Sequence, residues 1–93
     1  MRRWAWRAVW ASFSQSADDL FKEANGLYKE GKLEKAVELY SDIEDQGLAS
    51  SELFYNMGNC YYKLNQVASS IYYYEKALKL DPLNEDAQSN VAF

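Results

Sequence analysis

The residue types that carry out catalysis are sparse in this sequence of 93 residues. There is no histidine, so the single cysteine, Cys60, lacks the base that nucleophilic catalysis requires. Acidic pairs occur at 18–19 and 85–86, where we expect helices to begin and where acids favour the helix dipole. The four glycines are isolated, which gives no phosphate-binding loop. The sequence therefore predicts a protein that is not an enzyme, with no metal site and no cofactor.

Charge divides the sequence into a basic arm and an acidic body. Residues 1–16 contain Arg2, Arg3 and Arg7 and no acid, so the net charge of −4 leaves −7 on residues 17–93. An acidic body argues against nucleic acid as a partner. No apolar run approaches the roughly 18–20 residues that span a bilayer. The length is that of one small domain.

Residues 51–84 have the pattern of two consecutive helices. A first apolar stripe recurs at helical spacing, at Phe54, Met57 and Tyr61. Asn65 then interrupts the pattern, and asparagine is one of the few residues that accept a left-handed turn. The second stripe comprises Val67, Ile71, Tyr74, Ala77 and Leu78. Pro82 ends the unit because proline cannot continue a helix.

The preceding residues repeat this pattern without a gap. Ser16 and Asp19 resemble a capping box, which predicts that a helix begins there. A shift of 34 residues superimposes one unit on the other, pairing Ala24 with Gly58, Asn25 with Asn59, Tyr28 with Tyr62, Lys29 with Lys63, Gly31 with Asn65 and Tyr40 with Tyr74. The match has exceptions: Glu23 replaces Met57, Glu44 replaces Leu78, and Leu48 replaces Pro82.

With these residues the sequence resembles the tetratricopeptide repeat (TPR) family, whose unit is a pair of antiparallel helices with small residues at their crossing. The resemblance implies an all-α fold, a TPR helix-turn-helix solenoid of two repeats plus a C-terminal capping helix. It assigns residues 17–50 to repeat 1, 51–84 to repeat 2, and 85–93 to a capping helix or truncated third repeat. It also implies that Cys60 is a small buried core residue.

In the TPR family the first helices of successive repeats line a concave groove that binds a protein or peptide ligand. The family's groove positions fall on Asp18 and Glu52 and on eight residues that we predict to bind a peptide: Phe21, Asn25, Tyr28, Lys29, Tyr55, Asn59, Tyr62 and Lys63. Asparagines can hydrogen-bond a peptide backbone, and rigid aromatic rings dominate interface hot spots. Alternatively, the tyrosines pack against neighbouring helices with only their hydroxyls in water. The implied function is a non-enzymatic scaffold for protein binding.

Two neighbouring tyrosines suggest a second contact surface. Tyr72 is expected on the convex, solvent-facing side, where TPR repeats usually carry a charged residue. Beside Tyr73 it could form a second patch for a partner.

The arm at residues 1–16 is unlike the body. If it is helical, Trp6, Val9, Trp10 and Phe13 share one face. Three interpretations fit: a remnant of a secretory signal, a basic amphipathic anchor on a membrane or partner groove, and a natural or added helix that covers an exposed repeat face. The alternative function is a self-assembling structural subunit, a homo-oligomer joined by open repeat ends and by Trp4, Trp6, Trp10 and Phe13.

A narrower resemblance concerns the order FKEANGLYKEGKLEKAVELY, ELFYNMGNCYYKL and ALKLDPLNEDAQSN. It resembles the TPR segment of bacterial aerotolerance-operon (Bat-type) proteins. That resemblance implies a bacterial cell-envelope location on the periplasmic side, where the segment holds partner proteins, with the cytoplasm as the alternative.

Overall fold

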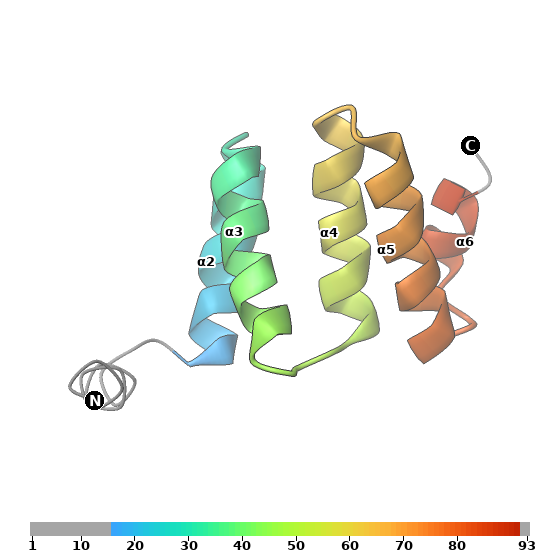
Figure 1. Ribbon diagram of the computed structural model, residues 1–93, viewed down its shortest axis with the longest axis horizontal. Coiled ribbons are helices and arrows are strands. Elements are labelled where there is room, and N and C mark those ends of the chain that lie inside the picture. Colours follow the sequence, from blue (N-terminus) through green and yellow to red (C-terminus); the bar gives the residue numbers. More distant parts are fainter. Residues whose placement is uncertain (1–15, 92–93) are drawn as a thin grey trace, which may run out of the picture.

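The computed structural model describes residues 16–91, and over this range its regular structure is helical (Figure 1). The helices are α2 (Ala17–Lys29), α3 (Leu33–Asp45), α4 (Ser51–Lys63), α5 (Val67–Leu80) and α6 (Glu85–Val91). The pairs α2/α3 and α4/α5 form successive hairpins, and α6 packs on α5. The predicted all-α helical solenoid is confirmed. Most of the arm, with Trp4, Trp6, Trp10 and Phe13, lies outside the described residues, as do Ala92 and Phe93.

The first helix of each unit begins at a capping residue that recurs every 34 residues. Ser16 Oγ accepts a hydrogen bond from the backbone N of Asp19 at 3.2 Å, which confirms the predicted start. Ser50 Oγ accepts from the N of Leu53 at 3.0 Å, and Asn84 Oδ1 from the N of Ala87 at 3.0 Å. Each cap satisfies a backbone donor that the first turn leaves unpaired. The third cap shows that α6 starts as α2 and α4 do.

The turns inside the two hairpins are also equivalent. Gly31 has a φ of 81° and Asn65 a φ of 64°, so both occupy the left-handed region as predicted. The residue after each turn donates back into its helix: Lys32 N to Leu27 O at 2.9 Å, and Gln66 N to Tyr61 O at 2.9 Å. This pair of positions is the Schellman ending of a helix.

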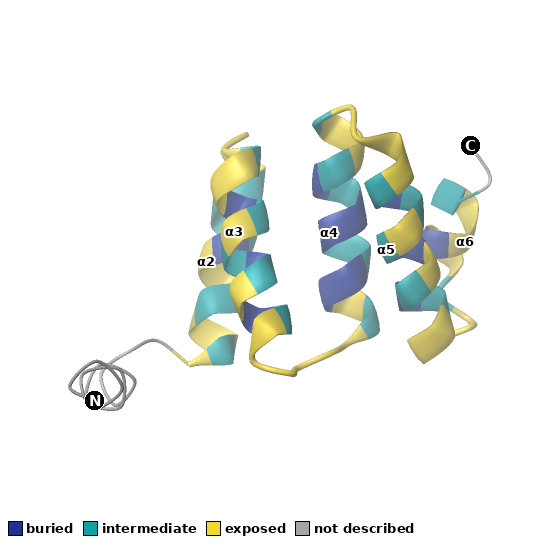
Figure 2. Ribbon diagram, in the orientation of Figure 1, coloured by how far each residue is buried: buried dark blue, intermediate teal, exposed yellow. Residues whose placement is uncertain are grey.

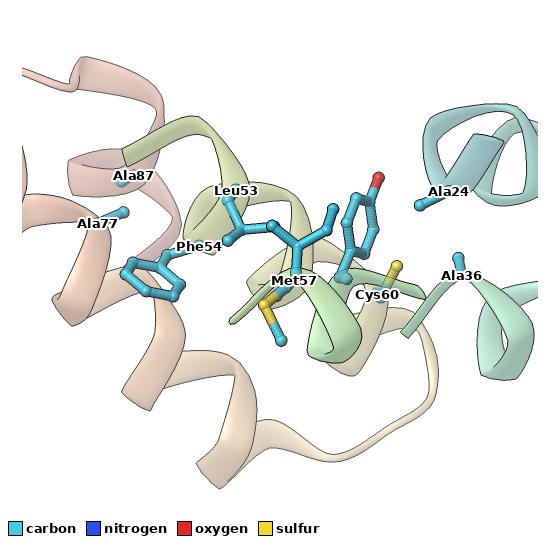
Figure 3. Packing of buried hydrophobic residues seen from close by; sticks show 10 residues of the cluster. Ala24, Ala36, Leu53, Phe54, Met57, Cys60, Ala77 and Ala87 are labelled. Carbon is cyan, nitrogen blue, oxygen red and sulfur yellow. The ribbon is translucent and has the colours of Figure 1, made fainter. Parts of the chain in front are cut away.

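The core is centred on α4, which packs against the first hairpin on one side and α5 on the other (Figures 2 and 3). Its buried residues are Leu53, Phe54, Met57, Gly58 and Cys60. Neighbouring helices contribute smaller side chains or rings: Ala24, Ala36, Tyr40, Ile43, Tyr74, Ala77 and Ala87. Cys60 is fully buried, as predicted.

One position in the predicted second stripe is wrong. Val67 is 45% exposed, whereas Tyr74 and Ala77 of the same stripe are buried. Val67 is the first residue of α5, directly after the hairpin turn, and there the helix has not yet come under cover.

Helices α4 and α5 approach closely at Gly58. A Cβ atom built at this residue would lie 2.5 Å from Cδ1 of Tyr74. Tyr74 is 1% exposed, so its ring has little room to move aside. The small residue predicted at the crossing is therefore required by the packing.

Candidate functional site

The candidate site lies along α2, α4 and α6, the helices that each begin a unit. Polar side chains join these helices in sequence. Asn25 Oδ1 of α2 accepts a hydrogen bond from Tyr40 Oη of α3, and a second from Asn56 Nδ2 of α4 at 3.1 Å. The second helix of the hairpin and the first helix of the next unit are thus held by one amide oxygen.

The same arrangement recurs one unit later. Asn59 Oδ1 of α4 accepts from Tyr74 Oη of α5, and from Asn90 Nδ2 of α6 at 3.3 Å. Burial raises the pKa of Tyr74 and of its counterpart Tyr40, so both hydroxyls are protonated donors at neutral pH. We call these two sets of bonds the tyrosine–asparagine network.

The network changes what the two predicted asparagines can offer a ligand. A carbonyl oxygen has two lone pairs, and both are used on Asn25 and on Asn59. A ligand therefore meets the Nδ2 group of each residue, which can donate to a backbone carbonyl. The side chains cannot rotate to present their oxygens without breaking the network.

One end of the site is a hollow of about 190 Å³, which we call the Tyr62 hollow. It is lined by residues of α2, α4, α5 and α6: Tyr28, Asn59, Tyr62, Lys63, Tyr74, Ser89 and Asn90. Tyr62 is 49% exposed. Lys63 Nζ lies 5.2 Å from the centroid of the Tyr28 ring, a cation–π contact that joins α4 to α2. Four of the eight predicted peptide-binding residues therefore meet here.

The other end is a hollow of about 230 Å³ between the starts of α2 and α4, which we call the Phe21 hollow. Its apolar lining includes Phe21, Leu48 and Leu53. The charged side chains that line it are Asp18 and Glu52, both acidic. The charged residue lining the Tyr62 hollow is Lys63, so the two ends carry opposite charge.

The remaining predicted residues line neither hollow. Asn25 belongs to the network, and the Tyr55 ring packs on Tyr74 with centroids 5.8 Å apart. Lys29 is exposed at the end of α2. Sequence reasoning overlooked the network roles of Asn56 and Asn90. Their 34-residue spacing, combined with that of Tyr40 and Tyr74, was the signal that could have found them.

A larger hollow, of about 470 Å³, lies on the side formed by α3 and α5. Tyr72 lines it and is 57% exposed, as predicted. Beside it Lys76 Nζ pairs with Glu44 Oε2 at 2.5 Å, and Tyr73 Oη donates to Glu44 Oε1 at 2.9 Å. Lys76 Nζ also lies 4.4 Å from the centroid of Phe54. We call Glu44, Phe54, Tyr73 and Lys76 the Glu44 clamp, since it joins the two hairpins.

The chemistry of the described residues is that of a binding surface. Burial raises the pKa of the Cys60 thiol to about 12, so it is protonated at neutral pH. Within residues 16–91, no three histidine, cysteine or acidic side chains are placed to hold a metal ion. No helix in this range is long and apolar enough to cross a membrane.

Comparison with protein families agrees with this geometry. Residues 51–84 match the family model described as Tetratricopeptide repeat, the same bounds as the second predicted repeat. No curated protein matches the sequence. The matched family consists of repeats that generally serve as protein-interaction modules and typically as non-enzymatic scaffolds. The narrower resemblance to Bat-type proteins is not confirmed by this match.

Proposed function

Since residues 51–84 match the tetratricopeptide repeat, we propose that the chain is a protein-interaction module that holds a peptide or partner helix against α2, α4 and α6. The Tyr62 hollow is the observation that carries the proposal. It combines exposed aromatic area with a lysine and an amide, and it draws these groups from three successive first helices. Tyrosine in such a setting supplies large contact area at little entropic cost.

The opposite charges at the two ends imply a ligand with a preferred direction. An acidic side chain or carboxylate of the ligand fits beside Lys63, and a basic side chain fits beside Asp18 and Glu52. Between them the Nδ2 groups of Asn25 and Asn59 are placed to donate to backbone carbonyls. Complementary charge of this kind fixes orientation and speeds association more than it adds affinity. We therefore propose a peptide with separated acidic and basic ends around an apolar centre.

The test uses peptides selected from a displayed random library on the full chain, with affinities then measured by titration calorimetry. Tyr62→Ala should weaken binding at least tenfold, about 1.4 kcal/mol, because it removes the exposed ring of the hollow. Tyr72→Ala is the matched control, because it removes an equally exposed tyrosine from the opposite side of the molecule. Asn59→Ala is a poor test because it also leaves Tyr74 without its acceptor.

The two variants distinguish the outcomes. Loss of binding in Tyr62→Ala with retention in Tyr72→Ala supports the proposal. The reverse result would transfer the binding role to the side formed by α3 and α5. Retention of full affinity in both variants would refute binding in the Tyr62 hollow.

A further inference from the structure

The Phe21 hollow lies where the described chain begins. Ala17 and Asp18 line it, and Ser16 next to them has an extended backbone, with φ −68° and ψ 166°. The fifteen residues that precede Ser16 are therefore tethered at the edge of the hollow. Their composition differs sharply from that of the body, so we asked whether it complements this particular site.

The charges are complementary. Asp18 and Glu52 are the charged side chains lining the hollow, and neither takes part in the ion pairs of the described residues. The preceding segment contains Arg2, Arg3 and Arg7 and no acid. The larger hollow on the opposite side is less suited to it, because its rim carries Lys76 and Lys79.

The size and apolar lining also match. Phe21, Leu48 and Leu53 line the hollow, and Leu48 is 45% exposed. A cavity of about 150 Å³ accepts benzene in another protein, and the Phe21 hollow, at about 230 Å³, has room for an aromatic side chain. Phe13 and Trp10 lie three and six residues before Ser16. At about 3.3–3.6 Å per residue they can reach roughly 10 and 20 Å.

We infer that residues 1–15 bind the Phe21 hollow of their own chain. An aromatic side chain of residues 10–13 fills the hollow, and the arginines lie beside Asp18 and Glu52. The short tether gives the segment an effective concentration of the order of millimolar, which favours binding in cis over binding to a second chain. The inference goes beyond the proposed function, since this binding needs no ligand. Its consequence is that a ligand reaching the acidic end of the site must displace the segment.

Tryptophan fluorescence of the full chain tests this directly, because all three tryptophans, Trp4, Trp6 and Trp10, lie in the segment. The expected result is emission shifted to the blue of a synthetic peptide of residues 1–15, with acrylamide quenching reduced severalfold. Asp18→Asn combined with Glu52→Gln should move both signals back toward the free peptide, as should 0.5 M salt through screening. Phe21→Ala should do the same by removing an apolar wall. Circular dichroism confirms that the variants stay folded.

Tyr72→Ala and Lys63→Gln are the controls and should leave both signals unchanged. Emission and quenching equal to those of the free peptide would refute the inference. A blue shift that appears only at high protein concentration would also refute it, because binding would then be in trans. A shift lost in Tyr72→Ala but kept in the Asp18/Glu52 variant would place the segment on the opposite side and refute the assigned site. None of these results depends on the peptide selected for the Tyr62 hollow.

Discussion

Gly58 sets the distance between the two helices of the second hairpin. Its missing side chain leaves the space that the buried Tyr74 ring fills, and this ring donates from its hydroxyl to Asn59, the residue next to Gly58. A small residue here therefore serves both packing and the tyrosine–asparagine network.

We expect Gly58→Ala to destabilise the protein by about 1–3 kcal/mol. The added methyl group overpacks against Tyr74, and this cost exceeds the gain of up to about 1 kcal/mol that alanine brings to a helix. Urea denaturation followed by circular dichroism measures the change.

Gly26→Ala is the matched control. This glycine is also helical, but nothing lies within 4 Å of an added Cβ atom. We expect the variant to be more stable by about 0.5–1 kcal/mol. Equal effects of the two substitutions would contradict the assigned role of Gly58.

Single positions show how far the sequence can predict this site. The burial of Cys60 and the left-handed turn at Asn65 depend on local pattern and repeat position, and both are confirmed. The bonds of Asn25 and Asn59 could not be predicted in the same way. Their partners lie 15 and 31 residues away in sequence, so the bonds depend on how three helices align.

At the scale of whole elements, the Glu44 clamp joins the two hairpins. The sequence showed Glu44 only as an exception, an acid where the second unit has Leu78. The structure explains it, since the carboxylate accepts from Tyr73 and pairs with Lys76 of α5. Glu23, the other acidic exception, is exposed, whereas its counterpart Met57 is buried because α4 packs between two sets of neighbours.

We expect Glu44→Ala to cost about 1–2 kcal/mol of unfolding free energy. It leaves Tyr73 without its acceptor and Lys76 without its counter-charge, although both side chains of the ion pair keep partial solvent access. Lys76→Met should change stability by less than about 1 kcal/mol, because methionine packs well on aromatic rings such as Phe54.

The exposed pair of Lys32 and Glu30 provides the control for these denaturation measurements. Its side chains are 59% and 61% exposed, so Glu30→Ala should stay within about 0.5 kcal/mol of the parent. If Glu44→Ala proved equally mild, the clamp would contribute nothing to the junction of the hairpins.

At the scale of the whole molecule, several groups hold their protons more tightly when folded. Burial raises the pKa values of Cys60, Tyr40, Tyr73 and Tyr74. Burial lowers the pKa of Lys76, but the hydrogen bond and charge of Glu44 outweigh it, so the net direction is also upward. A raised folded pKa means that the folded state binds more protons than the unfolded state in alkaline solution.

Stability should therefore be fully present below about pH 9, near the ordinary thiol pKa of 9.0, and should fall as the pH rises toward the folded values. Urea denaturation at pH 7, 9 and 10.5 gives the free energy of unfolding at each point. Tyr73→Phe should weaken the dependence by removing one raised group. An unfolding free energy that stayed constant to pH 10.5 would contradict the linkage.

The overall architecture was the part most accessible from the sequence, because a pattern that recurs every 34 residues fixes helix, turn and cap together. Ser16, Ser50 and Asn84 show this, since each caps a first helix. The place of the Trp-rich arm was not accessible in this way. Nothing in its own pattern refers to Asp18 and Glu52, which come together only when α2 and α4 pack.

The tyrosine–asparagine network has a consequence for how such a chain could change length. Each amide oxygen is shared between one unit and the first helix of the following unit, so every junction uses the same three residue types in the same register. A tandem duplication of residues 51–84 inserted after Asn84 would bring a new Asn56 to Asn59 of the preceding copy, and the final copy would still meet Asn90. New units could thus be spliced in without redesigning a boundary, and the binding surface would grow by whole repeats.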